Sequence, residues 1–124
     1  MKSAKDYLAE ANAVVPRISA EDALKHHGAT GALFVDVRDS AAIAKTGTIK
    51  GAVRIPRGFM EFSADETSPY YNPAMKRDAS IYLVCGAGGQ AALTGKVLKE
   101  MGYDKVVNIG GFGDWEKAGG PTES

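Results

Sequence analysis

Short apolar segments alternate with amphipathic segments along this 124-residue chain. Runs that are rich in Val and Ile and do not alternate with polar residues are typical of strands buried on both faces of a sheet. Such runs occur at residues 32–38, 52–56, 80–85 and 105–110, and residues 15–19 are interpreted as a short opening strand. The apolar pattern therefore predicts a sheet of about five strands.

Helical patterns lie between these strands. Ser19 is a predicted N-cap, with Asp22 as a capping-box acid, for a helix that runs as far as Gly28. Residues 88–102 form a second helical pattern, with Ala92, Val97, Leu98 and Met101 near one face and Gly102 at its end. Shorter helices are expected at residues 39–45 and 114–119. Strands that alternate with helices imply right-handed crossovers, and hence an α/β fold with a mostly parallel sheet and helices on both faces.

Residues 57–76 form the one long connection without a regular pattern. Long loops in compact domains are often functional. Its Phe59, Met60, Tyr70 and Tyr71 either line a pocket or anchor the loop to the core, and anchoring is the commoner role.

Composition narrows the class of protein. The length suits one domain, and 44% apolar with 24% charged residues is typical of a soluble globular chain. Lys plus Arg equals Asp plus Glu at 15 each, so neither a nucleic-acid partner nor a membrane surface is expected. A single cysteine fits a reducing compartment, and no signal peptide or membrane span is visible, so a cytoplasmic location is expected.

That cysteine, Cys85, ends a predicted strand and is followed by Gly86-Ala87-Gly88-Gly89 and a helix. Ligands of parallel sheets bind beyond the carboxyl ends of the strands. A glycine-rich loop before a helix can turn its backbone N–H groups inward and stabilise an anion, whether a thiolate, a persulfide or a substrate oxyanion. A free cysteine is often only a small buried hydrophobe. Its position directly before the glycines favours a nucleophile in a cradle of amides.

The order of several motifs resembles the rhodanese-like sulfurtransferases. The resemblance rests on five motifs. They are the loop Cys85–Gln90, Asp36-Val37-Arg38, residues 47–52 with Ile55-Pro56, Gly110-Gly111-Phe112 with Trp115, and residues 119–121. The segment 57–76 is similar to the same connection in a bacterial single-domain subgroup. The resemblance covers about residues 15–121, with residues 1–14 as a helical extension, and implies a single three-layer rhodanese-like domain.

The resemblance also implies a reaction without metal or organic cofactor. Cys85 takes sulfane sulfur from a small anionic donor, either thiosulfate or a persulfide, and passes it from a Cys85 persulfide to cyanide or to a thiol, free or on a protein. Substrate-binding residues implied in this way are Gly86, Ala87, Gly88, Gly89, Gln90 and Ala91. A monomer and a homodimer are both compatible with the sequence.

The loop departs from the family pattern where many members carry an arginine. Gln90 stands there and supplies hydrogen-bond donors without charge, so recognition of an anionic donor is expected to weaken by about 1.5–3 kcal/mol. Ala87 lacks a hydroxyl that related loops often have, Thr48 replaces the usual histidine, and residues 39–47 lack the usual glutamate. The last two changes are expected to affect structural hydrogen bonds. Thiosulfate is therefore expected to be a poor donor.

Charged residues outside the loop can either contribute to the site or serve the structure and the surface. Arg57 is the best candidate to restore positive charge near the cysteine, with Arg54 and Lys96 as further candidates, although a solvated surface arginine is an equal alternative. Asp36 and Arg38 end a strand on the expected active face, and a structural ion pair is favoured over catalysis. His26 and His27 have no cluster of partners that would make a metal site, and Trp115 is expected in the core.

Three functions remain open. The first is a sulfurtransferase, and the second is a non-catalytic rhodanese-like module that binds an anion or a partner, which Gln90 supports. The third is a phosphatase or arsenate reductase of the related cysteine-loop type. Such enzymes usually need an arginine in the loop, where Gln90 is followed by Ala91 and Ala92.

Overall fold

The computed structural model describes residues 1–124 and contains a four-stranded parallel sheet. The strand order is β3 (Val53–Arg54), β1 (Ala32–Asp36), β4 (Ser80–Cys85) and β5 (Val106–Gly111). A single parallel bridge from Arg17 to Asn108 extends the sheet beyond β5, so the expected opening strand is reduced to one pair. A separate antiparallel pair joins β2 (Thr48–Ile49) to β6 (Thr122–Glu123).

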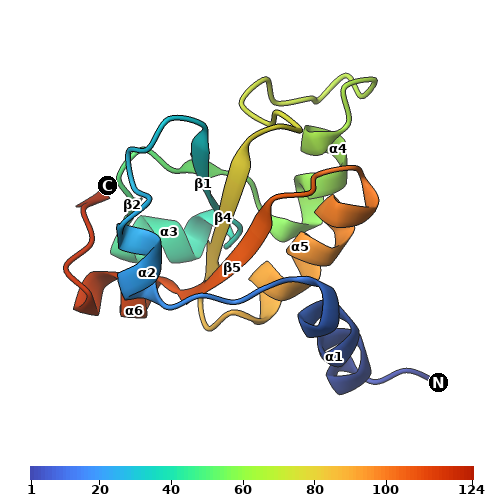
Figure 1. The fold of residues 1–124 in the computed structure, drawn as a ribbon, viewed down its shortest axis with the longest axis horizontal. Coiled ribbons are helices and arrows are strands. Elements are labelled where there is room, and N and C mark those ends of the chain that lie inside the picture. The colour runs from blue at the N-terminus through green and yellow to red at the C-terminus, as the bar shows by residue number, and fades with distance from the viewer.

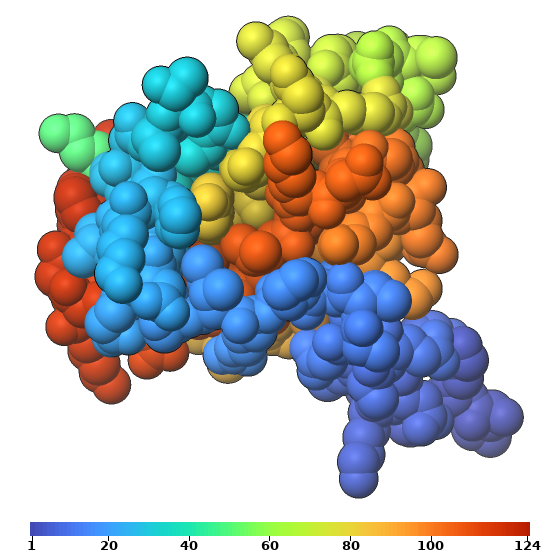
Figure 2. All heavy atoms as spheres, viewed as in Figure 1, coloured from blue at the N-terminus to red at the C-terminus, as the bar shows by residue number.

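Helices cover both faces of this sheet, as predicted (Figure 1). They are α1 (Ala4–Val14), α2 (Ala20–Leu24), α3 (Ser40–Thr46), the 3-10 turn η1 (Arg57–Phe59), α4 (Met60–Ala64), α5 (Gly89–Glu100) and α6 (Phe112–Lys117). Helix α1 packs on α5, and Figure 2 shows it in dark blue as a lobe that projects beyond the body of the domain. No helix combines the length and the apolar character needed to cross a bilayer.

The alternation of side chains along β4 divides the core into two layers. Ile81, Leu83 and Cys85 belong to the cluster that includes residues of α4 and α5. Tyr82 and Val84 belong to the cluster that includes residues of α2 and α6. Cys85 therefore lies on the α5 side of the sheet, at the end of a strand that is buried from Ile81 onward.

Several elements differ from the sequence-based expectations. Helix α2 ends at Leu24, because the next residues form i→i−3 turns before Gly28 at φ +83°. Ser19 caps α2 as predicted, since its side chain accepts from the Asp22 N–H. The Asp22 side chain does not complete the predicted capping box and instead lies 3.3 Å from Lys25 Nζ. The expected irregular connection 57–76 begins with η1 and α4, whose Met60 is fully buried.

Candidate active site

Cys85 occupies the carboxyl end of β4 and is only 1% exposed. The backbone N–H of Gly88 donates to Cys85 Sγ at 2.9 Å, and the N–H of Ala91 donates at 3.4 Å. Gly88 is the N-cap of α5 and has φ +105°, a conformation that L side chains rarely adopt. The loop thus directs amides at the sulfur, and negative charge on the sulfur strengthens such hydrogen bonds.

Strand β5 holds this loop in place. A Cβ on Gly111 would collide with the carbonyl oxygen of Gly86, so the two backbones touch. The buried Asn108 donates from Nδ2 to the carbonyl oxygen of Gly88 at 2.9 Å and accepts from the N–H of Gly110 at 2.8 Å. Asn108 was missed by the sequence analysis, although a lone polar residue in an apolar run was an available signal.

Arg17 is a second residue that the sequence analysis missed. Its Nη2 donates to the carbonyl oxygen of Ala87 at 3.4 Å. A Cβ on Gly88 would collide with Nη1, and one on Gly110 would lie 2.9 Å from Nη2, so the guanidinium packs against bare backbone. A positive charge therefore lies against a loop that has no arginine of its own, and the bridge between Arg17 and Asn108 helps to bring it there.

The remaining residues of the cysteine loop are more exposed to solvent than Cys85 and Gly88. Gly86, Ala87 and Gln90 are exposed, whereas Gly89 is half-buried. The side chain of Gln90 makes no hydrogen bond within the protein, while its carbonyl oxygen accepts from Thr94 Oγ1 at 2.7 Å. Gln90 therefore leaves its amide available to solvent or to a ligand.

Asp36 and Arg38 form a buried ion pair at the end of the adjacent strand β1. Arg38 Nη2 lies 2.7 Å from Asp36 Oδ2, and Asp36 is fully buried. Thr48 Oγ1 donates to the same carboxylate oxygen at 2.7 Å, and Arg38 Nη2 also donates to the carbonyl oxygen of Gly47 at 2.9 Å. The Arg38 guanidinium lies over the Phe112 ring, 4.5 Å from its centroid. These contacts tie β1 to the start of β2 and present no open functional group.

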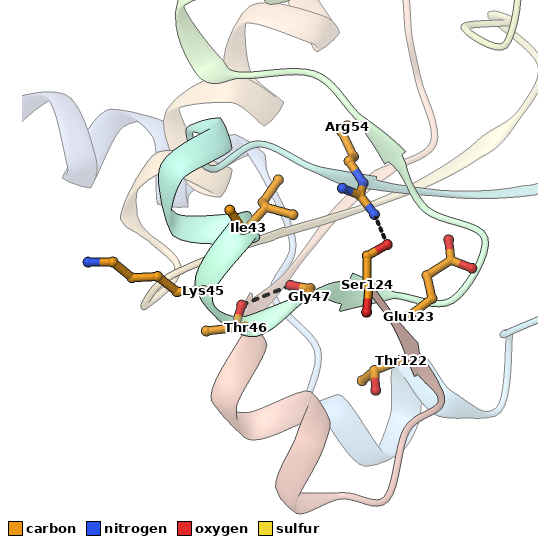
Figure 3. Close-up of a pocket in the computed structure, with 9 residues that line it drawn as sticks. Ile43, Lys45, Thr46, Gly47, Arg54, Thr122, Glu123 and Ser124 are labelled. Carbon is orange, nitrogen blue, oxygen red and sulfur yellow. Dashed lines mark hydrogen bonds between the residues drawn. The ribbon is translucent and has the colours of Figure 1, made fainter.

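Arg57 and Arg54 have different surroundings. Arg57 Nη1 contacts Glu61 Oε1 at 3.1 Å, and Arg57 lines a groove together with Gly89 of the cysteine loop and Lys96. Arg54 Nη2 instead donates to the Ser124 carbonyl oxygen at 2.6 Å. Figure 3 shows this contact in a cavity of about 550 Å³ between α3 and β6, which no residue of the cysteine loop lines.

Some of the aromatic and histidine residues singled out in the sequence anchor or fill the core, and others are exposed on the surface. Tyr71 donates its hydroxyl to the Met75 carbonyl oxygen and anchors the connection, whereas Phe59 and Tyr70 are 41% and 61% exposed and pack on Phe62. Trp115 is fully buried, as expected. His26 stacks on Tyr82, and His27 Nε2 contacts the Lys50 carbonyl oxygen at 2.7 Å. No group of three or more His, Cys, Asp or Glu side chains is arranged to hold a metal ion.

Residues 19–118 match the family model of the rhodanese-like domain. A solved protein of unknown function from Rhodopseudomonas palustris CGA009, described as a possible tyrosine phosphatase, is 37% identical with a TM-score of 0.93, over 99% of this chain and 96% of that one. The polysulfide-sulfur transferase homodimer of Wolinella succinogenes is 25% identical with a TM-score of 0.73, over 96% of this chain and 85% of that one.

Two curated relatives are each 30% identical. The putative sulfur carrier protein YrkF of Bacillus subtilis aligns over 66% of this chain and 40% of its own length. Protein HIGH ARSENIC CONTENT 1, mitochondrial, of Arabidopsis thaliana aligns over 73% of this chain and 56% of its own length. The chain thus spans about half the length of the curated relatives that it matches.

Proposed function

The chain belongs to the rhodanese-like domain family, and from that premise we propose that it is a sulfurtransferase that carries sulfane sulfur on Cys85. The observation that supports this most directly is the pair of backbone amides, from Gly88 and Ala91, aimed at a sulfur at a strand end. The names of two relatives, a putative sulfur carrier and a polysulfide-sulfur transferase, point to the same chemistry.

In the first half-reaction, the Cys85 thiolate attacks the sulfane sulfur of a donor such as thiosulfate. A bond forms between Sγ and the sulfane sulfur, the bond to the sulfonate sulfur breaks, and its electron pair leaves with sulfite. The terminal persulfide sulfur then carries the negative charge. The amides of the loop from Gly86 to Ala91 stabilise that charge and need little reorganisation, because β5 and Arg17 hold the loop.

In the second half-reaction, a thiolate or cyanide attacks the terminal sulfur. The new bond joins the acceptor to that sulfur, the bond to Sγ breaks, and Cys85 returns as a thiolate. No metal or organic cofactor takes part in the proposed cycle. The single thiol suits a reducing compartment, and we assign the reaction to the cytoplasm as part of the proposal.

Donor preference follows from Gln90. Because Gln90 is uncharged and the loop has no arginine of its own, a doubly charged donor such as thiosulfate gains little charge-assisted binding from the loop. A persulfide donor carries less charge and loses less. We therefore expect slow turnover with thiosulfate, and Gln90→Arg is expected to raise kcat/KM for thiosulfate by about tenfold or more, the equivalent of 1.5–3 kcal/mol.

The test is sulfur transfer from thiosulfate to cyanide by the purified protein, with Cys85→Ser as the blank and Gln90→Arg as the comparison. Turnover that disappears in Cys85→Ser supports the enzyme. Activity that appears only in Gln90→Arg indicates a working scaffold adapted to another donor. The contrary result is that neither protein turns over and that the intact mass shows no persulfide on Cys85 after exposure to a persulfide donor. The hypothesis of a non-catalytic binding module then replaces that of a sulfurtransferase.

One observation keeps a phosphatase as a second candidate, namely the description of the R. palustris relative as a possible tyrosine phosphatase. Phosphoryl transfer requires neutralisation of the equatorial phosphate oxygens, and the loop here supplies amides but no arginine. We therefore expect no hydrolysis of p-nitrophenyl phosphate and no effect of vanadate on sulfur transfer. Hydrolysis that requires Cys85 would reverse this order of preference.

A further inference from the structure

An apolar groove of about 540 Å³ lies between α1 and α5, beside the cysteine loop. Ala4, Tyr7 and Leu8 of α1 form one side, and Leu93 and Val97 of α5 form the other. This volume falls in the range of about 300–1,000 Å³ that is typical of small-ligand sites.

The groove reaches the cysteine loop at Gly89. This residue is part of its lining, and a Cβ on Gly89 would lie 3.7 Å from Leu8 Cδ2, so α1 touches the loop itself. The N–H of Ala91, two residues further on, donates to Cys85 Sγ. A ligand in the groove therefore has one end at Gly89 of the cysteine loop, while Cys85 itself lies behind the groove's lining.

The charges in the groove are of one sign. Its lining contains the cations Arg57 and Lys96 and no acidic residue. Lys96 lies 3.4 Å from Glu100 Oε2, in a pair whose members are 33% and 65% exposed. Exposed pairs of this kind contribute little, so a ligand anion can replace the partner. Lys96 lies seven residues after Gly89, which is about 10 Å along a helix.

The groove also depends on a segment outside the family domain. The family model begins at residue 19, whereas three of the lining residues, Ala4, Tyr7 and Leu8, lie in α1. The site is therefore specific to chains that carry this helix.

We propose that the groove binds an acceptor of Cys85 sulfur that is an amphipathic organic thiol, with an apolar chain of about six to eight carbons and a terminal anion that pairs with Lys96. This rests on the proposed function, because the thiol has to reach a persulfide on the buried Cys85 from the Gly89 end of the groove. The acceptor thiolate attacks the terminal sulfur, its new S–S bond forms as the bond to Cys85 Sγ breaks, and the products are the organic persulfide and the Cys85 thiolate.

The experiment compares ω-mercaptoalkanoates of three, six and eight carbons as acceptors, with the same donor throughout. Each methylene that enters the groove is expected to raise kcat/KM by about two- to fourfold, until the carboxylate reaches Lys96. The eight-carbon thiol with a terminal hydroxyl in place of the carboxylate is expected to be the poorer acceptor. Lys96→Glu is expected to lower kcat/KM for the eight-carbon carboxylate by about fivefold.

Lys99→Glu is the matched control, because Lys99 lies on the same helix outside the groove and contacts the Asp104 carbonyl oxygen. It is expected to keep the chain-length preference. Equal kcat/KM for all three chain lengths, in a protein that still transfers sulfur to cyanide, would overturn the groove proposal and leave the proposed function standing.

Failure to transfer sulfur to any acceptor would remove the proposed function instead. The groove is then tested by calorimetric binding of decanoate to Cys85→Ser protein. Binding that Lys96→Glu weakens and Lys99→Glu does not would support an amphipathic-anion site, and no binding would overturn it.

Discussion

Two neighbouring parallel strands end in groups that can carry negative charge, and these two groups have different hydrogen-bond partners. Asp36 ends β1, in register with Val84, and Cys85 is the next residue of β4. The Asp36 carboxylate receives a guanidinium, a hydroxyl and a backbone amide from Arg38 and Thr48, and it is fully buried. The Cys85 sulfur receives only backbone amides.

The same edge of the sheet therefore holds a structural ion pair, which ties β1 to β2, and a candidate nucleophile. A carboxylate that is neutralised by a buried arginine has no remaining capacity for a ligand, so its contribution is structural. The Cys85 sulfur faces backbone amides and no counter-charged side chain, and the same amides can serve a persulfide or a bound anion. Substitutions on each side should therefore separate stability from activity.

The largest effect is expected from removing the counter-charge of Asp36. Arg38→Met leaves a buried carboxylate without its cation, which typically costs about 3–5 kcal/mol. Chemical denaturation measures this as a loss of unfolding free energy. The double variant Asp36→Asn/Arg38→Met removes both charges and is expected to recover much of the loss. An unchanged free energy of unfolding in Arg38→Met would mean that the pair does not act as the tether described here.

A smaller loss of stability, with a large loss of activity, is expected from Gly88→Ala. An alanine at φ +105° costs about 1–3 kcal/mol, and its Cβ would collide with the Arg17 guanidinium. Relief of this strain displaces the amide that faces Cys85, so sulfur transfer should fall far more than stability.

Gly31→Ala is the matched control for that substitution. Gly31 has φ +81°, and a Cβ added there would meet nothing within 4 Å, so it shares the backbone strain without touching the loop. We expect a similar loss of stability and normal sulfur transfer. Equal activity losses in the two variants would show that general destabilisation, and not the cradle, is being measured.

The smallest effect is expected at Thr48. Thr48→Val removes one hydrogen bond to the Asp36 carboxylate while Arg38 remains, at a cost of about 1.5 kcal/mol. Thermal unfolding measures the loss, and sulfur transfer should not change. A change of kcat/KM in a protein that remains folded would connect the two strand ends functionally.

The sequence predicted the parts of the site that are local in the chain. Strand β4, the glycine loop and α5 follow one another, so an apolar run, a conformational need for glycine and a helical period were sufficient to place Cys85. The loop's support was not predictable in this way. Arg17 and Ala87 are 70 residues apart, and tertiary contacts such as the pairing of residue 17 with β5 bring them together. Helix α2 was overestimated because its pattern continues into turns that sequence patterns alone do not distinguish from helix.

The bridge between Arg17 and Asn108 also has a consequence for synthesis of the chain on the ribosome. The segment around Arg17 is synthesised before β1, β4 and β5, including the strand that it pairs with. Pairings between such distant segments form late, because the intervening chain must be closed first. The arginine therefore cannot take its place against the loop before β5 has been synthesised, and we expect the cradle around the thiol to be completed late in folding.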